Sequence, residues 1–151
     1  MKNAATSLQE KIHQAIPLSE AMGYHIIELT SSNIIVEGPL EPNVNIHGTG
    51  FAGSIYSLAT LSAWALVTHV LAEQAIEAEL VVVGADIKYL APVKGAIRCQ
   101  CQLSSNQIQL FSEELVKKNR ARLEAEVNVG KVPEAQLHIT LNASHKIEND
   151  N

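Results

Sequence analysis

A long uncharged stretch limits what this chain can fold into. Between residues 42 and 72 the sequence has no Asp, Glu, Lys or Arg, and residues 51–76 read as one long helix. Residues 51–72 could span a bilayer by length, but they include several hydroxyl side chains and no basic residues flank them. We therefore expect a helix that is buried on nearly all sides within a protein core, and no membrane span.

The flanking segments predict the layer that buries this helix. Six β-rich runs are expected at residues 24–30, 34–38, 80–90, 96–103, 122–129 and 135–143, with shorter helices at 6–15 and 106–119. A regular helix of this length would be ~37 Å long. The economical cover is a curved antiparallel sheet of six strands wrapped around the helix, which gives an α+β fold.

The composition is that of one domain in a reducing compartment. We expect a single domain over residues 1–151, with an N-terminal helix at 1–16, a core at 17–144 and a tail at 145–151. The net charge of −5 disfavours nucleic acid as a partner. Cys99 and Cys101 are too close in sequence for a useful disulfide, so free thiols and a cytoplasmic location are expected. We see no signal peptide.

Two motifs resemble a known family. The sequence N-I-H-G-T-G-F-A-G-S-I-Y-S-L runs from Asn45 to Leu58, and Y-L-A-P-V-K-G runs from Tyr89 to Gly95. They resemble the thioesterases of the hot-dog fold and, more narrowly, the YiiD-type thioesterase-like domain, over residues 17–144. The resemblance implies action on acyl-CoA or acyl-carrier-protein thioesters. The narrower group is associated with decarboxylation of malonyl-carrier protein, with the motif asparagine, here Asn45, in the active site.

Hydrolysis of a thioester needs a group that activates water. In the alignment with the hot-dog pattern, Thr60 stands where the acid is expected and Phe51 stands where the motif histidine is expected. No Asp or Glu lies between Glu41 and Glu73. His47 could act as a base because its ordinary pKa is near neutrality, but the case for a general base is weak.

Decarboxylation of a malonyl thioester has other requirements. The protein must stabilise an enolate oxygen with fixed donors and hold the carboxylate in a site with little water. The start of a long helix offers unpaired N–H groups. We predict that Asn45 and His47 are catalytic residues and that the substrate-binding residues are Gly48, Thr49, Gly50, Phe51, Gly53, Ser54 and Tyr56.

Each of these residues also has a structural interpretation. Asn45 could be a turn former, His47 a brace of the loop, and Thr49 the N-cap of the long helix. Ser54 could simply pack the helix, and Phe51, Tyr56 and Trp64 could belong to the core. The histidines show no ligand spacing, so no metal is expected.

The expected partners follow from the charge pattern and the sheet. Lys117, Lys118 and Arg120, with Arg122, form the one basic cluster, which is either a solvated helix end or a docking site for an acidic carrier protein or for CoA. The substrate carries phosphopantetheine, so we expect no cofactor. An exposed sheet edge predicts a homodimer or a dimer of dimers.

Three functions remain open at this level. They are decarboxylation of malonyl-carrier protein to acetyl-carrier protein, which would supply a primer for fatty acid synthesis, hydrolysis of acyl thioesters, and binding of acyl thioesters without catalysis. The fold alone does not choose among them.

Overall fold

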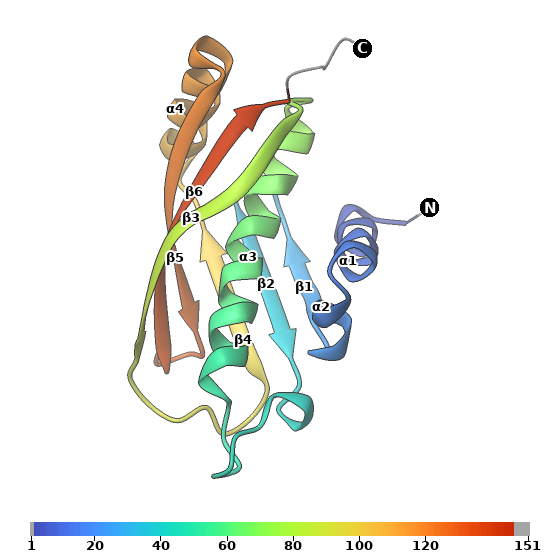
Figure 1. Cartoon of the computed structure of the whole chain (residues 1–151), viewed down its shortest axis with the longest axis vertical. Helices are drawn as coiled ribbons and strands as arrows, with labels where there is room; N and C mark the ends of the chain where they lie inside the picture. The colour runs from blue at the N-terminus through green and yellow to red at the C-terminus, as the bar shows by residue number, and fades with distance from the viewer. Residues whose placement is uncertain (1, 147–151) are drawn as a thin grey trace.

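The computed structural model describes residues 2–146 and consists of one sheet, a central helix and three peripheral helices (Figure 1). The helices are α1 (Ala4–Ala15), α2 (Pro17–Ala21), α3 (Ala52–Glu73) and α4 (Ser105–Lys118), with a 3-10 turn, η1, at Glu41–Asn43. The strands are β1 (His25–Leu29), β2 (Asn33–Gly38), β3 (Ala78–Tyr89), β4 (Ile97–Gln102), β5 (Arg120–Val129) and β6 (Ala135–His145).

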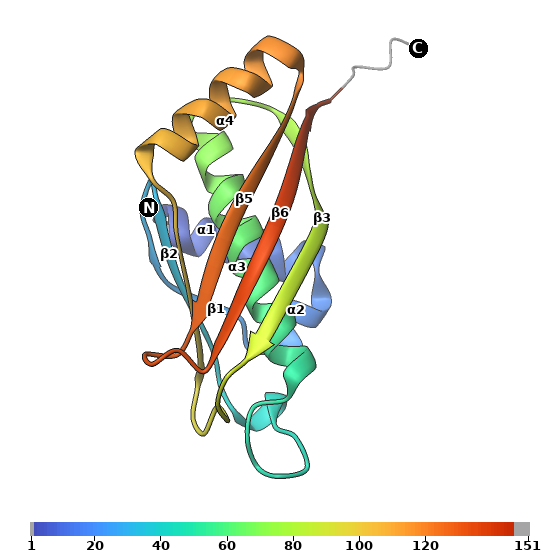
Figure 2. The ribbon, with the colours of Figure 1, turned by 90° about the vertical axis from the view of Figure 1, so that its left-hand side faces the viewer.

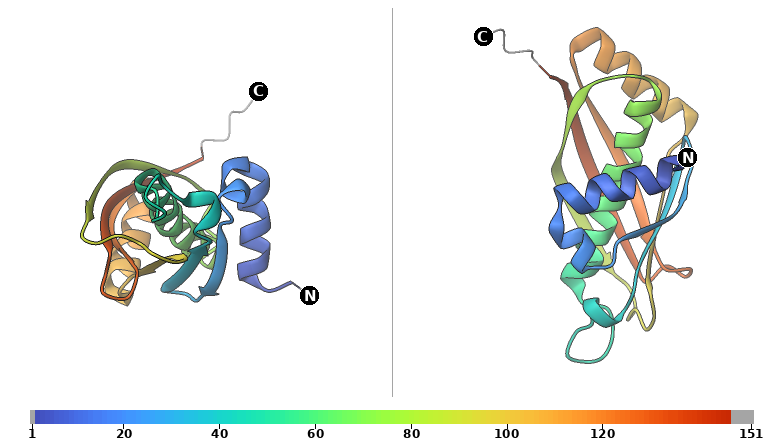
Figure 3. Two further views of the ribbon diagram at one scale, coloured as in Figure 1. Left: turned by 90° about the horizontal axis from the view of Figure 1, so that it is seen from below. Right: turned by 90° about the vertical axis from the view of Figure 1, so that its right-hand side faces the viewer.

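The strands form one antiparallel sheet in the order β1-β2-β4-β5-β6-β3. The sheet curves around α3, which lies in its concave face (Figures 1 and 2). Seen from below, the strands surround most of the helix, and α1 packs outside β1 (Figure 3). This is the predicted hot-dog fold.

The burial of α3 explains why its sequence lacks charge. The helix contacts strands β2, β3, β4, β5 and β6. Leu58, Ala59, Ala63 and Leu66 are completely buried, and the alanines let the strands approach closely. By length and composition α3 could cross a membrane, but more than half of its most apolar window is buried inside this domain. The uncharged stretch is thus a core helix.

Both cysteines lie on the core face of β4. Cys99 and Cys101 are free and buried, as predicted. Burial raises the pKa of both thiols to about 12. The neutral thiols therefore serve as small apolar side chains of the core.

The sequence placed every strand and both long helices, with ends that differ by a few residues. It missed α2, a single turn that starts at Pro17. In α1 the N-cap is Asn3, whose side chain accepts from the Thr6 N–H at 2.9 Å. The capping box at the start of α4 is formed by Ser104 and Gln107. Strand β6 extends to His145, and residues 147–151 of the predicted tail lie outside the described part of the chain.

The contact between α3 and the sheet is the main source of stability, so its loss should be costly. Leu66 is fully buried, and we expect Leu66→Ala to lower the free energy of unfolding by about 2–5 kcal/mol. Leu110→Ala on the exposed face of α4 should change it by less than about 0.5 kcal/mol. Urea titration monitored by circular dichroism measures both. Equal effects would contradict this view of the core.

Candidate active site

The loop that leads into α3 is held against the rest of the protein by buried hydrogen bonds. Asn43 is almost fully buried, and its Nδ2 donates to the carbonyls of Met22 and Pro39, each at 2.8 Å. The backbone carbonyl of Asn43 accepts from the Phe51 N–H at 2.7 Å. The Gly50 N–H donates to the Val93 carbonyl at 2.8 Å, which ties the loop to the β3–β4 connection. The start of α3 is therefore fixed from two sides.

Asn45 braces the tip of this loop. Its Oδ1 accepts from the backbone N–H groups of His47 at 2.9 Å and Thr49 at 3.1 Å. Its Nδ2 lies 2.9 Å from Thr49 Oγ1 and donates to the Gly50 carbonyl at 3.2 Å. Both the oxygen and the nitrogen of the Asn45 side-chain amide are thus hydrogen-bonded within the loop. This geometry makes Asn45 a positioning residue, and its direct contact with a substrate stays a prediction.

The predicted N-cap was wrong. The N-cap of α3 is Phe51, whereas Thr49 lies two residues earlier and bonds to Asn45. No side chain of the described residues caps this helix. The N–H groups of Ala52, Gly53 and Ser54 precede the first intrahelical bond, which the Ile55 N–H makes to the Phe51 carbonyl at 3.0 Å. This end of α3 can therefore receive an electron-rich oxygen.

Apolar and aromatic side chains surround the start of the helix. Phe51 was expected in the core as one alternative, but 53% of it is exposed, and its ring covers Gly53. A Cβ at position 53 would lie 2.7 Å from that ring, so a larger residue there would displace Phe51. Tyr56 is half-buried, and its predicted contact with substrate stays a prediction.

Tyr89 is a site residue that the sequence analysis did not select. Its hydroxyl donates to the Ala52 carbonyl at 2.9 Å, which connects the end of β3 to the first turn of α3. Partial burial and then the neighbouring Tyr56 raise the pKa of Tyr89, so the hydroxyl stays protonated near neutrality. The signal was its place in the Y-L-A-P-V-K-G motif, since motif residues at strand ends often face a site.

The remaining predicted residues occupy the loop and the first helical turn. His47 is exposed, and its backbone N–H is held by Asn45. Gly48 has φ +77°, a left-handed conformation that favours glycine. Ser54 is half-buried on α3. The nine predicted residues thus occupy the loop before α3 and its first turns, and Tyr89 of β3 contacts the same turn through its bond to Ala52.

The segment that carries the predicted site residues, 45–56, contains no Asp, Glu, Lys or Arg. Thr60 lies two turns into α3, and its hydroxyl is buried without a hydrogen-bond partner among the described residues. The uncharged stretch places no carboxylate on the loop after η1 or along α3 before Glu73. No acidic side chain lies in the first turn of α3 to offset the positive end of the helix dipole.

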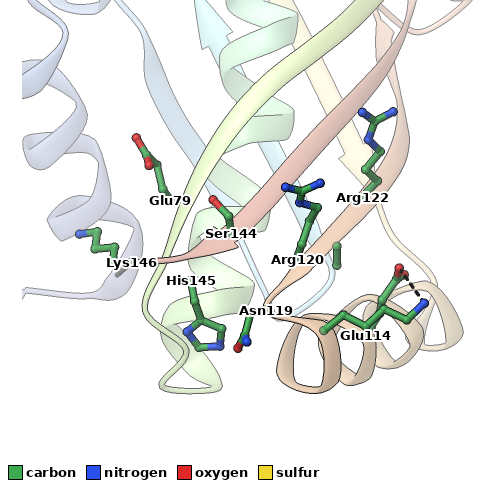
Figure 4. A pocket seen from close by; sticks show the side chains of 10 residues that line it. Glu79, Glu114, Asn119, Arg120, Arg122, Ser144, His145 and Lys146 are labelled. Atoms are coloured by element: carbon green, nitrogen blue, oxygen red, sulfur yellow. Dashed lines mark ion pairs between the residues drawn. The ribbon is translucent and has the colours of Figure 1, made fainter. Parts of the chain in front are cut away.

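The basic cluster lies at the other end of the fold (Figure 4). A groove of about 1350 Å³ is lined by residues from the start of β3, the end of α4, the start of β5 and the end of β6. Arg120 and Arg122 project from the outer face of β5. Lys118 also lines the groove, and its Nζ lies 3.8 Å from Glu114 Oε1. Lys117, which was predicted with them, is not among the lining residues. His145 and Lys146 extend the cluster to the end of β6.

Comparison with known families matches residues 5–139 to the model described as "Putative thioesterase (yiiD_Cterm)". The chain belongs to this family. The match covers the Asn45 loop, α3 and all the strands except the second half of β6.

Solved structures share the fold of this family member. A "putative thioesterase" from Shewanella oneidensis is 30% identical, with a TM-score of 0.79 over 94% of this chain and 97% of that one. A protein of unknown function from Chlorobaculum tepidum TLS is 26% identical, with a TM-score of 0.90 over 94% of each chain. A "probable thioesterase" from Pseudomonas aeruginosa is 18% identical, with a TM-score of 0.84 over 97% of this chain and 99% of that one, which supports the fold alone.

The brace at Asn45 predicts a specific change in backbone protection. Asn45→Ala removes the acceptor of the His47 and Thr49 N–H groups, so their hydrogen exchange should accelerate roughly 2- to 10-fold. Asn45→Asp keeps that acceptor and should retain most of the protection. Amide exchange by NMR measures both variants. Unchanged exchange in Asn45→Ala would show that the side chain does not hold the loop.

Proposed function

We propose that the protein acts on acyl thioesters and that its reaction is the decarboxylation of a malonyl thioester to an acetyl thioester. The observation that supports this most is the start of α3, where free backbone N–H groups meet an apolar surround without a carboxylate. The malonyl group would be held by a carrier protein or by CoA, and the phosphopantetheine would arrive with the substrate.

The chemistry fits a site built from dipoles. As the bond to the carboxylate carbon breaks, CO₂ leaves and its electron pair moves onto the thioester, which becomes an enolate. The negative charge then rests on the thioester oxygen, where the N–H groups of Ala52, Gly53 and Ser54 could bind it. A proton is then added at the carbon that lost CO₂, and the thioester remains intact.

The neutral surround also fits the substrate. The malonyl carboxylate would be repelled by an acidic side chain at the position of Thr60. Phe51 and Tyr56 offer an apolar surface, which weakens the solvation of a carboxylate and favours its loss as CO₂. Asn45 and Tyr89 would position the loop and the first helical turn on either side of the thioester.

Hydrolysis of acyl thioesters is the second candidate. It is favoured by the name of the family and by that of the similar protein from Shewanella. His47 is the side chain of the loop that could activate water. It is exposed rather than buried beside the helix start, which supports this reaction less well. Binding without catalysis is the outcome expected if neither reaction occurs.

The basic groove is proposed as the docking surface for the acidic carrier or for the phosphates of CoA. Arg120 and Arg122 stand on the outer face of β5, where a large partner could reach them. The groove adjoins the start of β3, which follows the end of α3, whereas the first turn of α3 lies at the other end of a helix about 33 Å long. A cytoplasmic location accords with a carrier protein as substrate and remains a proposal.

The products distinguish decarboxylation from hydrolysis. Purified protein incubated with malonyl-carrier protein should yield acetyl-carrier protein and CO₂, with no free thiol. Thr60→Asp should lower decarboxylation on the order of 10²-fold or more, because a carboxylate would oppose both the substrate and the enolate. Thr60→Asn is the matched control of similar size without charge. Mass spectrometry of the carrier separates the products.

The outcomes assign the function. Faster release of thiol from acetyl or longer acyl thioesters than of CO₂ from malonyl thioester would establish the hydrolase instead. Bound but unchanged thioesters would establish the binding module.

If the carrier protein docks on the groove, KM for the carrier-bound substrate should depend on the charge of the groove, whereas turnover of a substrate without the carrier should not. Reversal of Lys118, Arg120 and Arg122 to Glu should raise KM for malonyl-carrier protein roughly tenfold or more, because it removes complementary charge. Turnover of a malonyl-pantetheine substrate should stay within about twofold. Lys117→Glu, outside the groove, is the matched control. Equal effects of the triple variant on both substrates would mean that the cluster is only a solvated surface.

A further inference from the structure

The decarboxylation proposed above needs a group that returns a proton to carbon. Loss of CO₂ leaves an enolate, and CO₂ that stays beside an unprotonated enolate can add back to it. A proton donor within reach of the helix start therefore makes the step irreversible. The side chains that could donate are those of His47, Thr49, Ser54 and Tyr56 in the loop and first turns of α3, together with Tyr89 at the end of β3.

The loop residues and the serine are poorly suited to this transfer. Thr49 Oγ1 already lies 2.9 Å from Asn45 Nδ2 and 3.3 Å from Asn45 Oδ1. His47 is exposed, and its bond to Asn45 Oδ1 is made by its backbone N–H, which does not fix the imidazole. The hydroxyls of Thr49 and Ser54 are aliphatic and are much weaker acids than a phenol. The two tyrosines remain as candidates.

Of the two phenols, that of Tyr89 is fixed at the first turn of α3. Its hydroxyl donates to the Ala52 carbonyl at 2.9 Å. No hydrogen bond within residues 2–146 holds the hydroxyl of Tyr56 in the same way. The N–H groups proposed to bind the thioester oxygen belong to residues 52–54, so the hydroxyl of Tyr89 and these donors share one helical turn.

The backbone on both sides of Tyr89 is held in place. Tyr89 is the last residue of β3 and lies opposite Ala135 of β6. The next two N–H groups, of Leu90 and Ala91, both donate to the Glu134 carbonyl, at 2.7 and 3.1 Å. The phenol is therefore presented to the helix by a strand end with fixed backbone, and a proton donor held in this way does not have to be brought to the substrate.

The Tyr89 hydroxyl can turn away from its present acceptor without leaving that acceptor unpaired. In a regular α-helix, the Ala52 carbonyl also accepts from the N–H of Tyr56, four residues later. It therefore keeps a partner when the hydroxyl of Tyr89 turns away. The hydrogen of a hydroxyl rotates about the C–O bond, so the O–H group can point at a substrate carbon while the ring stays in place.

Tyr89 is also open to solvent, since 49% of it is exposed. Partial burial and then the neighbouring Tyr56, the titratable side chain that acts on it, raise the pKa of its phenol. Residue 89 therefore carries its proton near neutral pH, and water can return a proton after one has been given up.

We propose that Tyr89 is the catalytic acid that protonates the enolate carbon, a role that rests on the proposed decarboxylation. The bond between the methylene carbon and the carboxylate carbon breaks, CO₂ leaves, and the electron pair that remains forms the enolate. As the thioester carbonyl re-forms, the methylene carbon takes the proton of Tyr89, and the O–H electron pair stays on the phenolate oxygen. Water then reprotonates the phenolate, so each turnover consumes one proton from solvent and leaves the thioester intact.

Removal of the hydroxyl is the first test of this role. Tyr89→Phe keeps the ring, so we expect KM for malonyl-carrier protein to stay within about threefold. The kcat should fall on the order of 10²-fold or more, because CO₂ can add back to an enolate that is not protonated. Tyr24→Phe is the matched control. Its phenol is buried in the core, so the same substitution there should leave kcat within about twofold.

A fluorinated tyrosine at position 89 separates acid catalysis from support of the helix. It keeps the hydroxyl and its bond to Ala52 but has a more acidic phenol. An acid must carry its proton, so kcat should fall as pH rises through the pKa of residue 89, and with the fluorinated residue this fall should begin at lower pH. A hydroxyl that only held Ala52 would leave the pH profile of kcat unchanged. Initial rates of CO₂ release from malonyl-carrier protein, measured across pH, give both profiles.

Two results would overturn the proposal. One is a kcat of Tyr89→Phe within about threefold of the natural chain, and the other is an unshifted pH profile with the fluorinated residue. The same assay measures CO₂ release by the natural chain. If the natural chain releases no CO₂, the proposed decarboxylation fails and this step fails with it. If it releases CO₂ and either of the two results is found, this step alone fails.

Discussion

The burial of an uncharged helix inside a curved sheet is the constraint on which the rest of this structure depends. Helix α3 is 22 residues long and lies against five of the six strands. A charged side chain on its buried faces would need a partner inside the core. The helix therefore carries small and apolar residues, and the strands supply alternating apolar side chains that meet it. Both the stability of the fold and the neutrality of the candidate site follow from that one contact.

The same helix fixes the position of the site. Because α3 is held by the sheet along its length, its first turn is rigid, and the loop from η1 only has to close over it. Asn43 anchors that loop to the protein interior, Asn45 braces its tip, and Tyr89 ties the first turn to β3. Backbone N–H groups fixed in this way do not have to reorganise when charge develops near them, which is the property that an oxyanion site requires.

Much of the fold could be predicted from the sequence because its signals are local. Apolar and polar residues alternate along β5, which indicates a strand, and the lack of charge in α3 indicates a buried helix. The six strands are predicted by turn residues that separate apolar runs. The short helix α2 was not predicted because a single turn after Pro17 is too short to show a helical repeat of apolar residues. The N-cap of α3 was misassigned to Thr49, since the sequence suits a cap but the loop bonds use that side chain elsewhere.

The hydrogen bonds of the candidate site could not be predicted from the sequence, although the segment that forms it was identified there. Glycines and the motif located the loop, yet which bonds Asn45 makes depends on how the tip closes over Thr49 and Gly50. Tyr89 lies 37 residues from Ala52 in the chain, and only the pairing of β3 with β6 brings its hydroxyl to the helix. Likewise, Arg122, His145 and Lys146 join one groove because β5 starts beside the end of β6.

The central claim is that the backbone N–H groups at the start of α3 bind the thioester oxygen. The direct measurement is the ¹H–¹⁵N spectrum of the protein during titration with a malonyl-pantetheine analogue that cannot decarboxylate. We expect the amide signals of Ala52, Gly53 and Ser54 to shift most, and to shift downfield as hydrogen bonds form. Saturable binding that leaves these three signals in place and moves others instead would contradict it.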